Sequence, residues 1–351
     1  MSIDEKKLEN FLNKALSDLG GTISSSMVVV GEKLGFYKAL SGAGPLTSEE
    51  LSKKTGILER YVREWLNNQA AGGYLTYDPL TQKFTLPDEQ ALCLADENSP
   101  HFLLGAFQIF TSLAKDESKI IAAFKDGKGI SWGDHDCGLY EGTERFFRTG
   151  YSANLVNTWI PSLVGVSDKL KTGAKIADVG CGHGASTIIM AQAFPESEFI
   201  GFDYHQASID VARKRAKDAG LTDNIKFELA ESTNFPGKNY DLVTVFDALH
   251  DMGNPLGTAS HTFKSLKSNG TWMVVEPFAS DKIEENHNPI GRIFYGASSF
   301  ACVPCSLDMD GPALGAQAGP KKLEHLIKGG GFTKFRIAAT NPFNMVIEAN
   351  P

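Results

Sequence analysis

The sequence predicts an α/β protein, with a mainly helical N-terminal domain followed by a parallel sheet that ends in an antiparallel hairpin. Three observations lead to this prediction. From Lys175 onward, strand-like apolar runs alternate with helical patterns, which is typical of right-handed βαβ crossovers and a sheet covered by helices on both faces. The chain closes with two strand-like runs around a short Asn341-Pro342 turn. The first hundred residues have the pattern of three helices and a hairpin.

The N-terminal helices are indicated by apolar spacing and by end signals. Thr47 followed three residues later by Glu50 predicts a capping box. Two β-rich runs around Asp78-Pro79 predict a hairpin over 74–86. The three helical segments are 27–40, 47–56 and 58–73. Three helices followed by a hairpin predict a winged helix.

Seven strands are expected in the second half, so the fold class is a Rossmann-like seven-stranded sheet with a C-terminal antiparallel hairpin. The expected strands are 175–180, 198–204, 225–231, 240–249, 271–277, 332–340 and 343–350. The expected helices are 185–195, 207–220, 258–270 and 321–331. Between the two halves we expect helices over 101–126 and 152–165, separated by a glycine- and aromatic-rich loop over 127–151.

These patterns divide the chain into three parts. Residues 1–100 form the winged-helix domain, 101–170 a helical linker and cap, and 171–351 the sheet domain. Within the sheet domain, residues 279–320 form an insertion whose middle is apolar and aromatic. An insertion of this length in a compact domain is usually a lid or a binding segment.

The composition is that of an ordinary globular protein, with 351 residues and a formal net charge of −8. No apolar run approaches the roughly 20 residues that cross a bilayer, and the charged, amphipathic N-terminus is unlike a secretory signal. The cysteines are odd in number and scattered, which argues for a reducing compartment; they are Cys93, Cys137, Cys181, Cys302 and Cys305. We therefore expect a cytoplasmic protein.

The "CVPC" stretch places Cys302 and Cys305 three residues apart. No second Cys/His pair stands nearby in the sequence to complete four ligands. We therefore expect no metal site and interpret these cysteines as two small residues in a buried segment.

The stretch "IADVGCGHGAS" brings Gly180, Gly182 and Gly184 directly behind an apolar strand. It fits the dinucleotide pattern G-x-G-x-x-G/A as well as a tighter G-x-G-x-G. It lacks the Lys-Ser/Thr pair of a P-loop, which excludes most triphosphate sites. A dinucleotide and another adenosine-bearing ligand remain as candidates.

Two acids and the terminal hairpin bear on that choice. Asp178 precedes the glycines, where a carboxylate would repel a pyrophosphate and suits a ligand with an ammonium or sulfonium group. Asp203 ends the next strand and can accept hydrogen bonds from two ribose hydroxyls, as in NAD enzymes. Dinucleotide folds do not usually carry the hairpin. The alternatives are a helix-capping role for Asp178 and a solvated strand-end carboxylate for Asp203.

Together, residues from Lys175 to about Asn350 resemble the class I S-adenosylmethionine-dependent methyltransferases. The resemblance implies that S-adenosyl-L-methionine is the cofactor and that a set of residues around the glycine loop and the strand ends binds it. In this set Tyr204 lies against the adenine face. The implied set is Asp178, Gly180, Cys181, Gly182, Gly184, Asp203, Tyr204, Glu231, Ser232 and Asp247.

The segment "FDALHDMGNP" follows the fourth strand and resembles the His-Asp of winged-helix small-molecule O-methyltransferases. The resemblance implies that His250 is the general base, because an imidazole can take the proton of a hydroxyl acceptor. The tryptophan that usually follows in that family is absent here, and the alternative is that His250 and Asp251 cap the next helix. Glu276, at the end of the fifth strand, is expected to orient His250 or the acceptor, or to contact loop backbone.

The insertion adds a second resemblance. Its Cys-Val-Pro-x-Ser run, followed by Gly-Ala-Gln-Ala-Gly, is similar to the poorly characterised mycobacterial winged-helix methyltransferase group. The resemblance implies methyl transfer to a small molecule, with oxygen favoured and nitrogen or sulfur open.

The expected partners follow from charge and from the same resemblance. In the first hundred residues the acidic residues outnumber the basic ones, whereas DNA binding needs several cations against phosphates. We therefore expect no nucleic acid, no membrane and, as in the O-methyltransferases, a homodimer formed by the winged-helix module. The alternatives are a winged-helix transcriptional regulator that uses the second domain as a ligand sensor, and a nicotinamide-dependent oxidoreductase.

Overall fold

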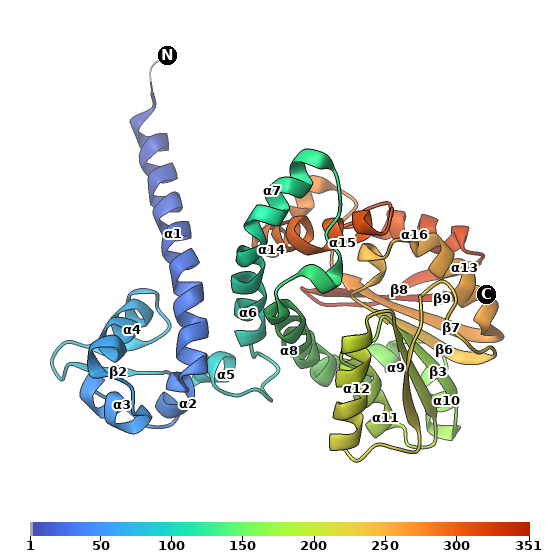
Figure 1. The fold of residues 1–351 in the computed structure, drawn as a ribbon, viewed down its shortest axis with the longest axis horizontal. Helices are drawn as coiled ribbons and strands as arrows, with labels where there is room; N and C mark the ends of the chain where they lie inside the picture. The colour runs from blue at the N-terminus through green and yellow to red at the C-terminus, as the bar shows by residue number, and fades with distance from the viewer. Residues whose placement is uncertain (1–2) are drawn as a thin grey trace. The chain divides into compact units, whose positions relative to one another are not determined.

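The computed structural model describes residues 3–351, drawn as a ribbon in Figure 1. The chain divides into two compact units. The first contains residues up to 114 and residues 137–149, and the second contains residues 115–136 and 150–351. The segment 101–170, predicted as a linker and cap, is thus shared between the two units.

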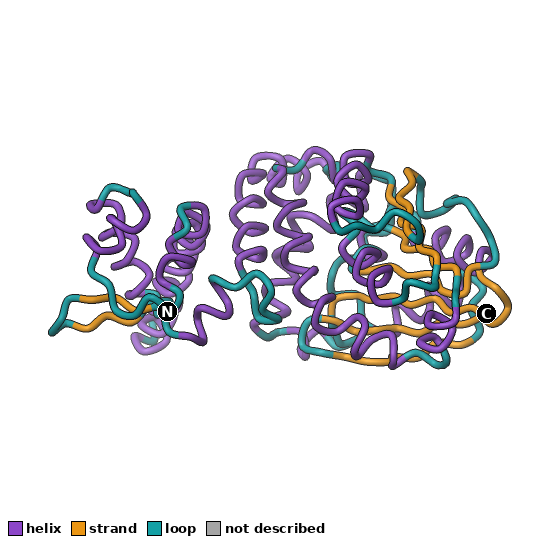
Figure 2. Tube along the Cα trace, turned by 90° about the horizontal axis from the view of Figure 1, so that it is seen from below, coloured by secondary structure: helices purple, strands orange, loops and turns teal. Residues whose placement is uncertain are grey.

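The first unit contains the predicted helices and hairpin, and Figure 2 shows its short hairpin beside the helices. The capping box is confirmed: Thr47 Oγ1 accepts from the Glu50 amide, and the Glu50 carboxylate accepts from the Thr47 amide at 2.7 Å. The elements are α1 (Glu5–Lys33), α2 (Phe36–Leu40), α3 (Ser48–Thr55), α4 (Glu59–Ala71), β1 (Thr76–Asp78), β2 (Lys83–Thr85), α5 (Asp88–Leu94), α6 (Leu104–Leu113) and most of α8 (Cys137–Asn154). The three helices and the hairpin of a winged helix are therefore present.

Trp65 of α4 is the centre of this unit's core. Its ring lies 4.8 Å from that of Phe36 and 5.2 Å from that of Tyr37, and its indole N–H donates to the Met27 carbonyl. A Cβ at Gly31 of α1 would come within 2.3 Å of the indole. The segment 27–40, predicted as one helix, forms parts of two helices. Helix α1 ends at Lys33, and Gly35, with φ +73°, turns the chain into α2.

The predicted loop over 127–151 is wrong from Cys137 onward, because residues 137–154 form α8. Its glycines allow close helix packing and do not end the helix. A Cβ at Gly105 of α6 would lie 2.5 Å from the Phe146 amide nitrogen, and a Cβ at Gly142 would lie 2.8 Å from the Ile109 amide nitrogen. The two helix backbones meet at the glycine pair.

The second unit has the predicted seven-stranded sheet, in the order β5-β4-β3-β6-β7-β9-β8. The strands are β3 (Lys175–Val179), β4 (Glu198–Asp203), β5 (Ile225–Leu229), β6 (Tyr240–Phe246), β7 (Leu266–Pro277), β8 (Lys334–Thr340) and β9 (Asn344–Asn350). β9 is antiparallel to both of its neighbours, as the terminal hairpin predicted. The strand order reverses between β3 and β6, where α/β sheets bind ligands at the carboxyl ends of the strands.

Helices cover both faces of this sheet. Ala177 and Val179 of β3 share one core cluster with Leu323 and Ile327 of α16, while the intervening Asp178 faces α11. The helices are α7 (Glu117–Asp126), α9 (Ile160–Ser162), α10 (Val166–Thr172), α11 (Ala185–Ala193), α12 (Gln206–Asp218), α13 (Pro255–Ser265), α14 (Pro289–Ala297), α15 (Val303–Asp308) and α16 (Pro320–Gly329). None of the helices among the described residues has the length and apolar character to cross a membrane.

The helix predicted over 258–270 ends earlier, at Ser265, and β7 begins at Leu266. Leu266 pairs with Tyr240 of β6 and is buried, so tertiary pairing overrides the helical pattern there. A Cβ at Gly270 would lie 3.0 Å from the Tyr240 carbonyl oxygen, so the strand backbones pass close together.

We predict that Gly105→Ala destabilises the protein by about 1–3 kcal/mol, because the added methyl overpacks a contact between two backbones. Gly150→Ala, in α8, is the matched control: a Cβ there meets nothing within 4 Å. The control should be neutral or gain up to about 1 kcal/mol of helix propensity. Denaturant unfolding of both variants measures the difference, and equal stabilities would contradict the close packing.

Candidate functional site

The glycine loop after β3 has a backbone that requires its glycines. Gly180, Gly182 and Gly184 have φ values of +74°, +50° and +77°, a region that side chains disfavour. A Cβ at Gly184 would come within 2.6 Å of Phe227, whereas a Cβ at Gly182 would meet no protein atom within 4 Å. Gly184 is therefore required by packing as well as by φ, while the space beside Gly182 is open.

The loop is tied to the end of β4 by hydrogen bonds. The amides of Gly180 and Cys181 both donate to the Phe202 carbonyl, at 2.8 and 3.0 Å. The Gly182 amide donates to Asp203 Oδ2 at 2.9 Å. The buried Cys181 thiol is packed against the sheet, because a Cβ at Gly201 would lie 3.0 Å from its Sγ. The loop conformation thus depends on the strand that carries Asp203.

Asp203 was expected to be a ribose ligand or a solvated strand-end acid. It is half-buried, and its other oxygen, Oδ1, accepts from the His205 amide at 2.9 Å. Burial raises the pKa of Asp203, while the two amide hydrogen bonds lower it, and the net shift is upward. Asp203 thus holds two backbone amides while part of it stays exposed, and ribose binding by Asp203 stays a prediction.

Asp178 is fully buried and faces the start of α11. Its Oδ2 accepts from the hydroxyls of Ser186 and Thr187 at 2.7 and 2.6 Å, and its Oδ1 accepts from Thr244 at 2.9 Å. Burial raises the pKa of Asp178, while the three hydroxyls lower it, and the net shift is upward. The carboxylate accepts from side chains rather than from helix amides, so it does not cap α11; its contact with a cationic ligand stays a prediction.

Three more predicted cofactor residues lie at the ends of β4 and β5. The Ala230 amide donates to the Asp203 carbonyl at 3.0 Å, which holds these two strand ends together. Glu231 is exposed, and the Ser232 hydroxyl lies 2.7 Å from that of Thr258. Tyr204 is 40% exposed, which leaves part of its ring accessible to a ligand.

Asp247, after β6, has φ +49° and accepts two hydrogen bonds from distant parts of the chain. The Tyr151 hydroxyl donates to its Oδ2 at 3.0 Å, and Asn344 Nδ2 donates to its Oδ1 at 2.8 Å. Burial, followed by the nearby Glu276 carboxylate, raises the pKa of Asp247 to about 8. Sequence reasoning missed Tyr151 and Asn344, because no local pattern links either of them to Asp247.

His250 and Glu276 form a buried pair. His250 Nδ1 lies 2.7 Å from Glu276 Oε2, and the Leu249 amide donates to Glu276 Oε1 at 3.0 Å. Burial lowers the pKa of His250, but the Glu276 carboxylate and Cys302 raise it, and the net shift is well upward. Because a carboxylate only accepts, Nδ1 carries the proton in this bond. Both contacts expected for Glu276, with His250 and with loop backbone, are present.

The alternative that His250 and Asp251 cap the next helix is wrong. The N-cap of α13 is Asn254, whose side chain accepts from the Gly257 amide at 2.8 Å. His250 and Asp251 instead belong to a short 3₁₀ turn, Leu249–Asp251.

The predicted insertion is largely helical and contacts this turn directly. The Ser306 hydroxyl of α15 donates to the Met252 carbonyl at 3.0 Å, and the Gly315 amide donates to the His250 carbonyl at 3.3 Å. A ring nitrogen of His250, a carboxylate oxygen of Asp251 and the Cys302 sulfur lie within 4.8 Å of one another. Sequence reasoning missed this cluster, because its search for partners of Cys302 stayed within the neighbouring sequence.

We predict that Asp178→Ala destabilises the second unit by about 3 kcal/mol, since three buried hydroxyls lose a charged acceptor. Asp178→Asn should cost less, because hydroxyls can rotate to bond an amide. Urea unfolding without ligand ranks the two variants. Equal stabilities for wild type and Asp178→Ala would show that the hydroxyls find other acceptors.

Two family models match the chain. The model described as "Methyltransferase domain" matches residues 170–327, and the model described as "Rv2258c-like winged HTH domain" matches residues 22–96. Both matches agree with the predicted fold class and with the resemblance stated from the sequence.

Curated relatives match in the second half. A demethylmenaquinone methyltransferase from Symbiobacterium thermophilum is 29% identical over 109 residues, 30% of this chain and 43% of the relative. Phosphoethanolamine N-methyltransferase 1 from Arabidopsis thaliana is 30% identical over 115 residues, 32% of this chain and 23% of the relative. The chain thus spans less than half the length of these relatives.

Solved structures match over the whole chain. Human N-acetylserotonin methyltransferase in complex with SAM has a TM-score of 0.69 and 17% identity, covering 100% of this chain and 99% of that one. An O-methyltransferase family protein from Burkholderia thailandensis has a TM-score of 0.70 and 14% identity, with 100% and 99% coverage. At these identities the likeness shows the fold.

Proposed function

We propose that this chain, which joins a winged helix-turn-helix domain to an S-adenosylmethionine-dependent methyltransferase domain, methylates a small-molecule acceptor, with oxygen the favoured recipient. The observation that carries the proposal is the glycine loop, whose Gly182 amide is bonded to Asp203 beside open space. This arrangement lies at the carboxyl ends of β3 and β4, where an α/β sheet binds its ligand.

Asp203 has the capacity to bind the cofactor ribose while it holds the loop. Each carboxylate oxygen has two acceptor sites, and each oxygen of Asp203 uses one of them for a backbone amide. Two acceptor sites remain for the two hydroxyls of a ribose. In this proposal Tyr204, half-exposed on the same strand end, lies against the adenine.

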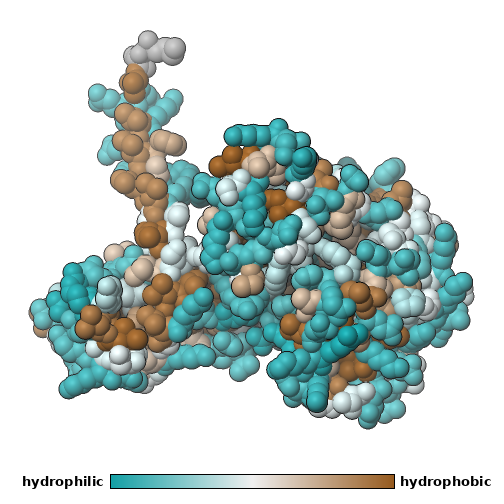
Figure 3. All heavy atoms as spheres, in the orientation of Figure 1, coloured by the Kyte–Doolittle hydropathy of each residue, from teal (hydrophilic) through white to brown (hydrophobic). Residues whose placement is uncertain are grey.

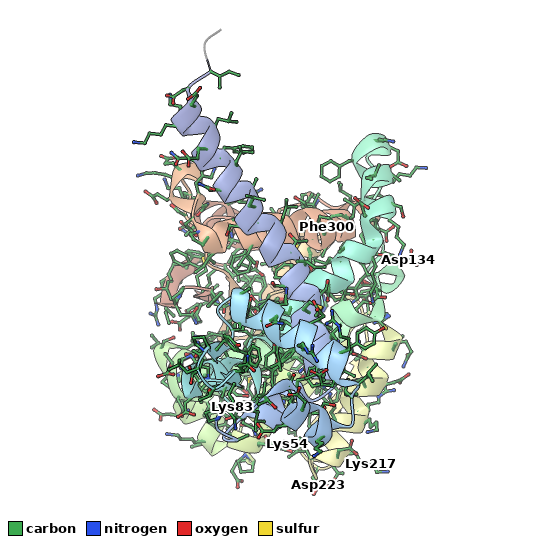
Figure 4. The ribbon with its side chains drawn as sticks, turned by 90° about the vertical axis from the view of Figure 1, so that its left-hand side faces the viewer. Lys54, Lys83, Asp134, Lys217, Asp223 and Phe300 are labelled. Carbon is green, nitrogen blue, oxygen red and sulfur yellow. The ribbon has the colours of Figure 1, made fainter. Side chains whose placement is uncertain are left out.

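We predict that Asp203→Ala weakens S-adenosylmethionine binding by about 1.5–3 kcal/mol, because charge-assisted hydrogen bonds to the ribose are lost. Isothermal calorimetry with S-adenosylmethionine, and with NAD for comparison, measures this. Asp223→Ala, an exposed acid labelled in Figure 4, is the control and should bind as wild type does. Unchanged affinity in Asp203→Ala would show that Asp203 does not bind the ribose. Binding of NAD but not of S-adenosylmethionine would overturn the proposal.

His250 is the proposed general base for a hydroxyl acceptor. Because Nδ1 donates to Glu276, Nε2 is the ring nitrogen that can receive the acceptor's proton. Glu276 is then a positioning residue that stabilises the imidazolium formed by that transfer. The Glu276 carboxylate and Cys302 raise the pKa of His250. The positive sulfonium of a bound cofactor would lower this pKa, because a like charge disfavours the imidazolium.

We predict that His250→Ala lowers turnover of a hydroxyl acceptor by roughly 10²–10⁴ while cofactor affinity stays nearly unchanged. Turnover with labelled cofactor and calorimetry test the two parts separately. His325→Ala, an exposed histidine of α16, is the control and should retain full turnover. If cofactor binding falls as much as turnover, His250 only shapes the loop.

A homodimer formed by α1 is the proposed assembly. Among the apolar residues over 27–40, four are buried within their own unit, namely Val28, Phe36, Tyr37 and Leu40, whereas Val30 and Leu34 are exposed. A longer exposed apolar surface lies earlier in α1 and is brown in Figure 3. Six apolar side chains of α1 are 46–66% exposed: Leu8, Phe11, Leu12, Leu16, Leu19 and Ile23. Apart from the adjacent pair at 11 and 12, successive members are three or four positions apart, which places them on one face of the helix. A stripe this long on one helix suits burial against a second copy.

We predict that the double variant Leu16→Glu/Leu19→Glu is a monomer, because each charge would be buried without a partner in the helix pair. Leu80→Glu, at the 92% exposed tip of the hairpin, should remain a dimer. Light scattering at micromolar concentration distinguishes them. A monomeric wild-type protein would contradict the proposed homodimer.

The charge distribution on the winged helix supports a role other than DNA binding. Arg60 and Arg63 of α4 are paired with Glu64 and Glu59 on the same helix. Lys83 of the hairpin, labelled in Figure 4, lies 3.3 Å from a glutamate of α3. These cations already have carboxylate partners, so they offer little free positive charge to a phosphate backbone.

A further inference from the structure

We propose that His250, Asp251 and Cys302 form a binding site for a divalent metal ion of the zinc class. Their ligand atoms, one ring nitrogen, one carboxylate oxygen and one sulfur, lie within 4.8 Å of one another. His250 is buried and the other two are half-buried. The Asp251 carboxylate lies beside both the imidazole and the thiol, so the three groups offer a nitrogen, an oxygen and a sulfur to one ion.

Glu276 orients the histidine as a metal ligand requires. Metal-binding histidines usually donate their second N–H to a carboxylate, which sets the tautomer and the ring orientation. Here His250 Nδ1 lies 2.7 Å from Glu276 Oε2. Glu276 is itself held by the Leu249 amide through Oε1 at 3.0 Å. The Nε2 lone pair is thus the one available to the ion.

Hydrogen bonds join the two segments that supply the ligands. His250 and Asp251 share the 3₁₀ turn, and Cys302 directly precedes α15 in the insertion. The Ser306 hydroxyl bonds the Met252 carbonyl at 3.0 Å, and the Gly315 amide bonds the His250 carbonyl at 3.3 Å. Protein hydrogen bonds therefore hold the segment that carries the sulfur close to the turn.

The donor set selects the kind of ion. Imidazole nitrogen, thiolate and carboxylate are the ligands of zinc, whereas Mg²⁺ and Ca²⁺ prefer oxygen donors. Three protein ligands leave one position of a tetrahedral ion for water or another small ligand.

The metal ion and the proposed base reaction compete for the same atom. A bound ion occupies the Nε2 lone pair that would receive the acceptor's proton. This competition rests on the proposed function: zinc should slow methylation of a hydroxyl acceptor, and a chelator should restore it. Binding of the ion itself requires neither the cofactor nor the acceptor.

Titration of the full chain with Co²⁺, followed by absorption, tests the site directly. We expect one equivalent to produce a thiolate-to-cobalt charge-transfer band and the visible bands of a four-coordinate ion. Cys302→Ser should lose the charge-transfer band, and Asp251→Asn should weaken binding. Glu276→Gln should lower affinity by about 10–100-fold, as outer-shell partners of metal ligands do. Cys137→Ser, which removes an exposed thiol, is the control and should keep the band.

Calorimetry with S-adenosylmethionine on the same samples reports whether each variant is folded, and it separates the two proposals. A wild type that binds the cofactor but shows no cobalt band would overturn the metal site and leave the proposed function standing. A cobalt band that survives in Cys302→Ser and disappears in Cys137→Ser would also overturn the proposed metal site. A cobalt band without cofactor binding would leave the metal site and overturn the methyltransferase proposal.

Discussion

The placement of carboxylates at one edge of a parallel sheet is the constraint on which the rest of this structure depends. Asp178, Asp203, Asp247 and Glu276 each lie within one residue of the end of a strand, and two of them are fully buried. A buried carboxylate is tolerated only where hydrogen-bond donors surround it. Each of the four has such donors, and these come from helices, strands and loops around the candidate site.

The donors come from a different source at each acid. Hydroxyls surround Asp178, while amides of the glycine loop and of His205, the N-cap of α12, hold Asp203. A tyrosine and an asparagine hold Asp247, and an imidazole and an amide hold Glu276. Three of these acids take part in holding a turn or loop. Asp203 holds the glycine loop, Asp247 is itself held in the turn after β6, and Glu276 holds the 3₁₀ turn of His250. Protein hydrogen bonds thus hold these three segments in place, which suits a site that orients its reactants.

The last of these turns serves two proposed purposes that exclude each other. A histidine held by a carboxylate through Nδ1 presents Nε2 either to a proton or to a metal ion. The approach of Cys302 from the insertion is what adds the second possibility. The insertion would then supply a metal ligand, Cys302. Metal binding would determine whether Nε2 of His250 is available to accept a proton.

The sequence by itself determined the elements and the residue types of the site. Local spacing sufficed for the Thr47 capping box, the glycine loop and the strand-end acids, because each depends on residues a few positions apart. Only the tertiary structure decided which groups meet. It turned 137–154 into a helix through the contact of Gly105 with α8, started β7 at Leu266 through its pairing with Tyr240, and brought Tyr151, Asn344 and Cys302 to strand ends far away in sequence. Such partners depend on packing between distant segments, for which a single sequence carries no periodic signal.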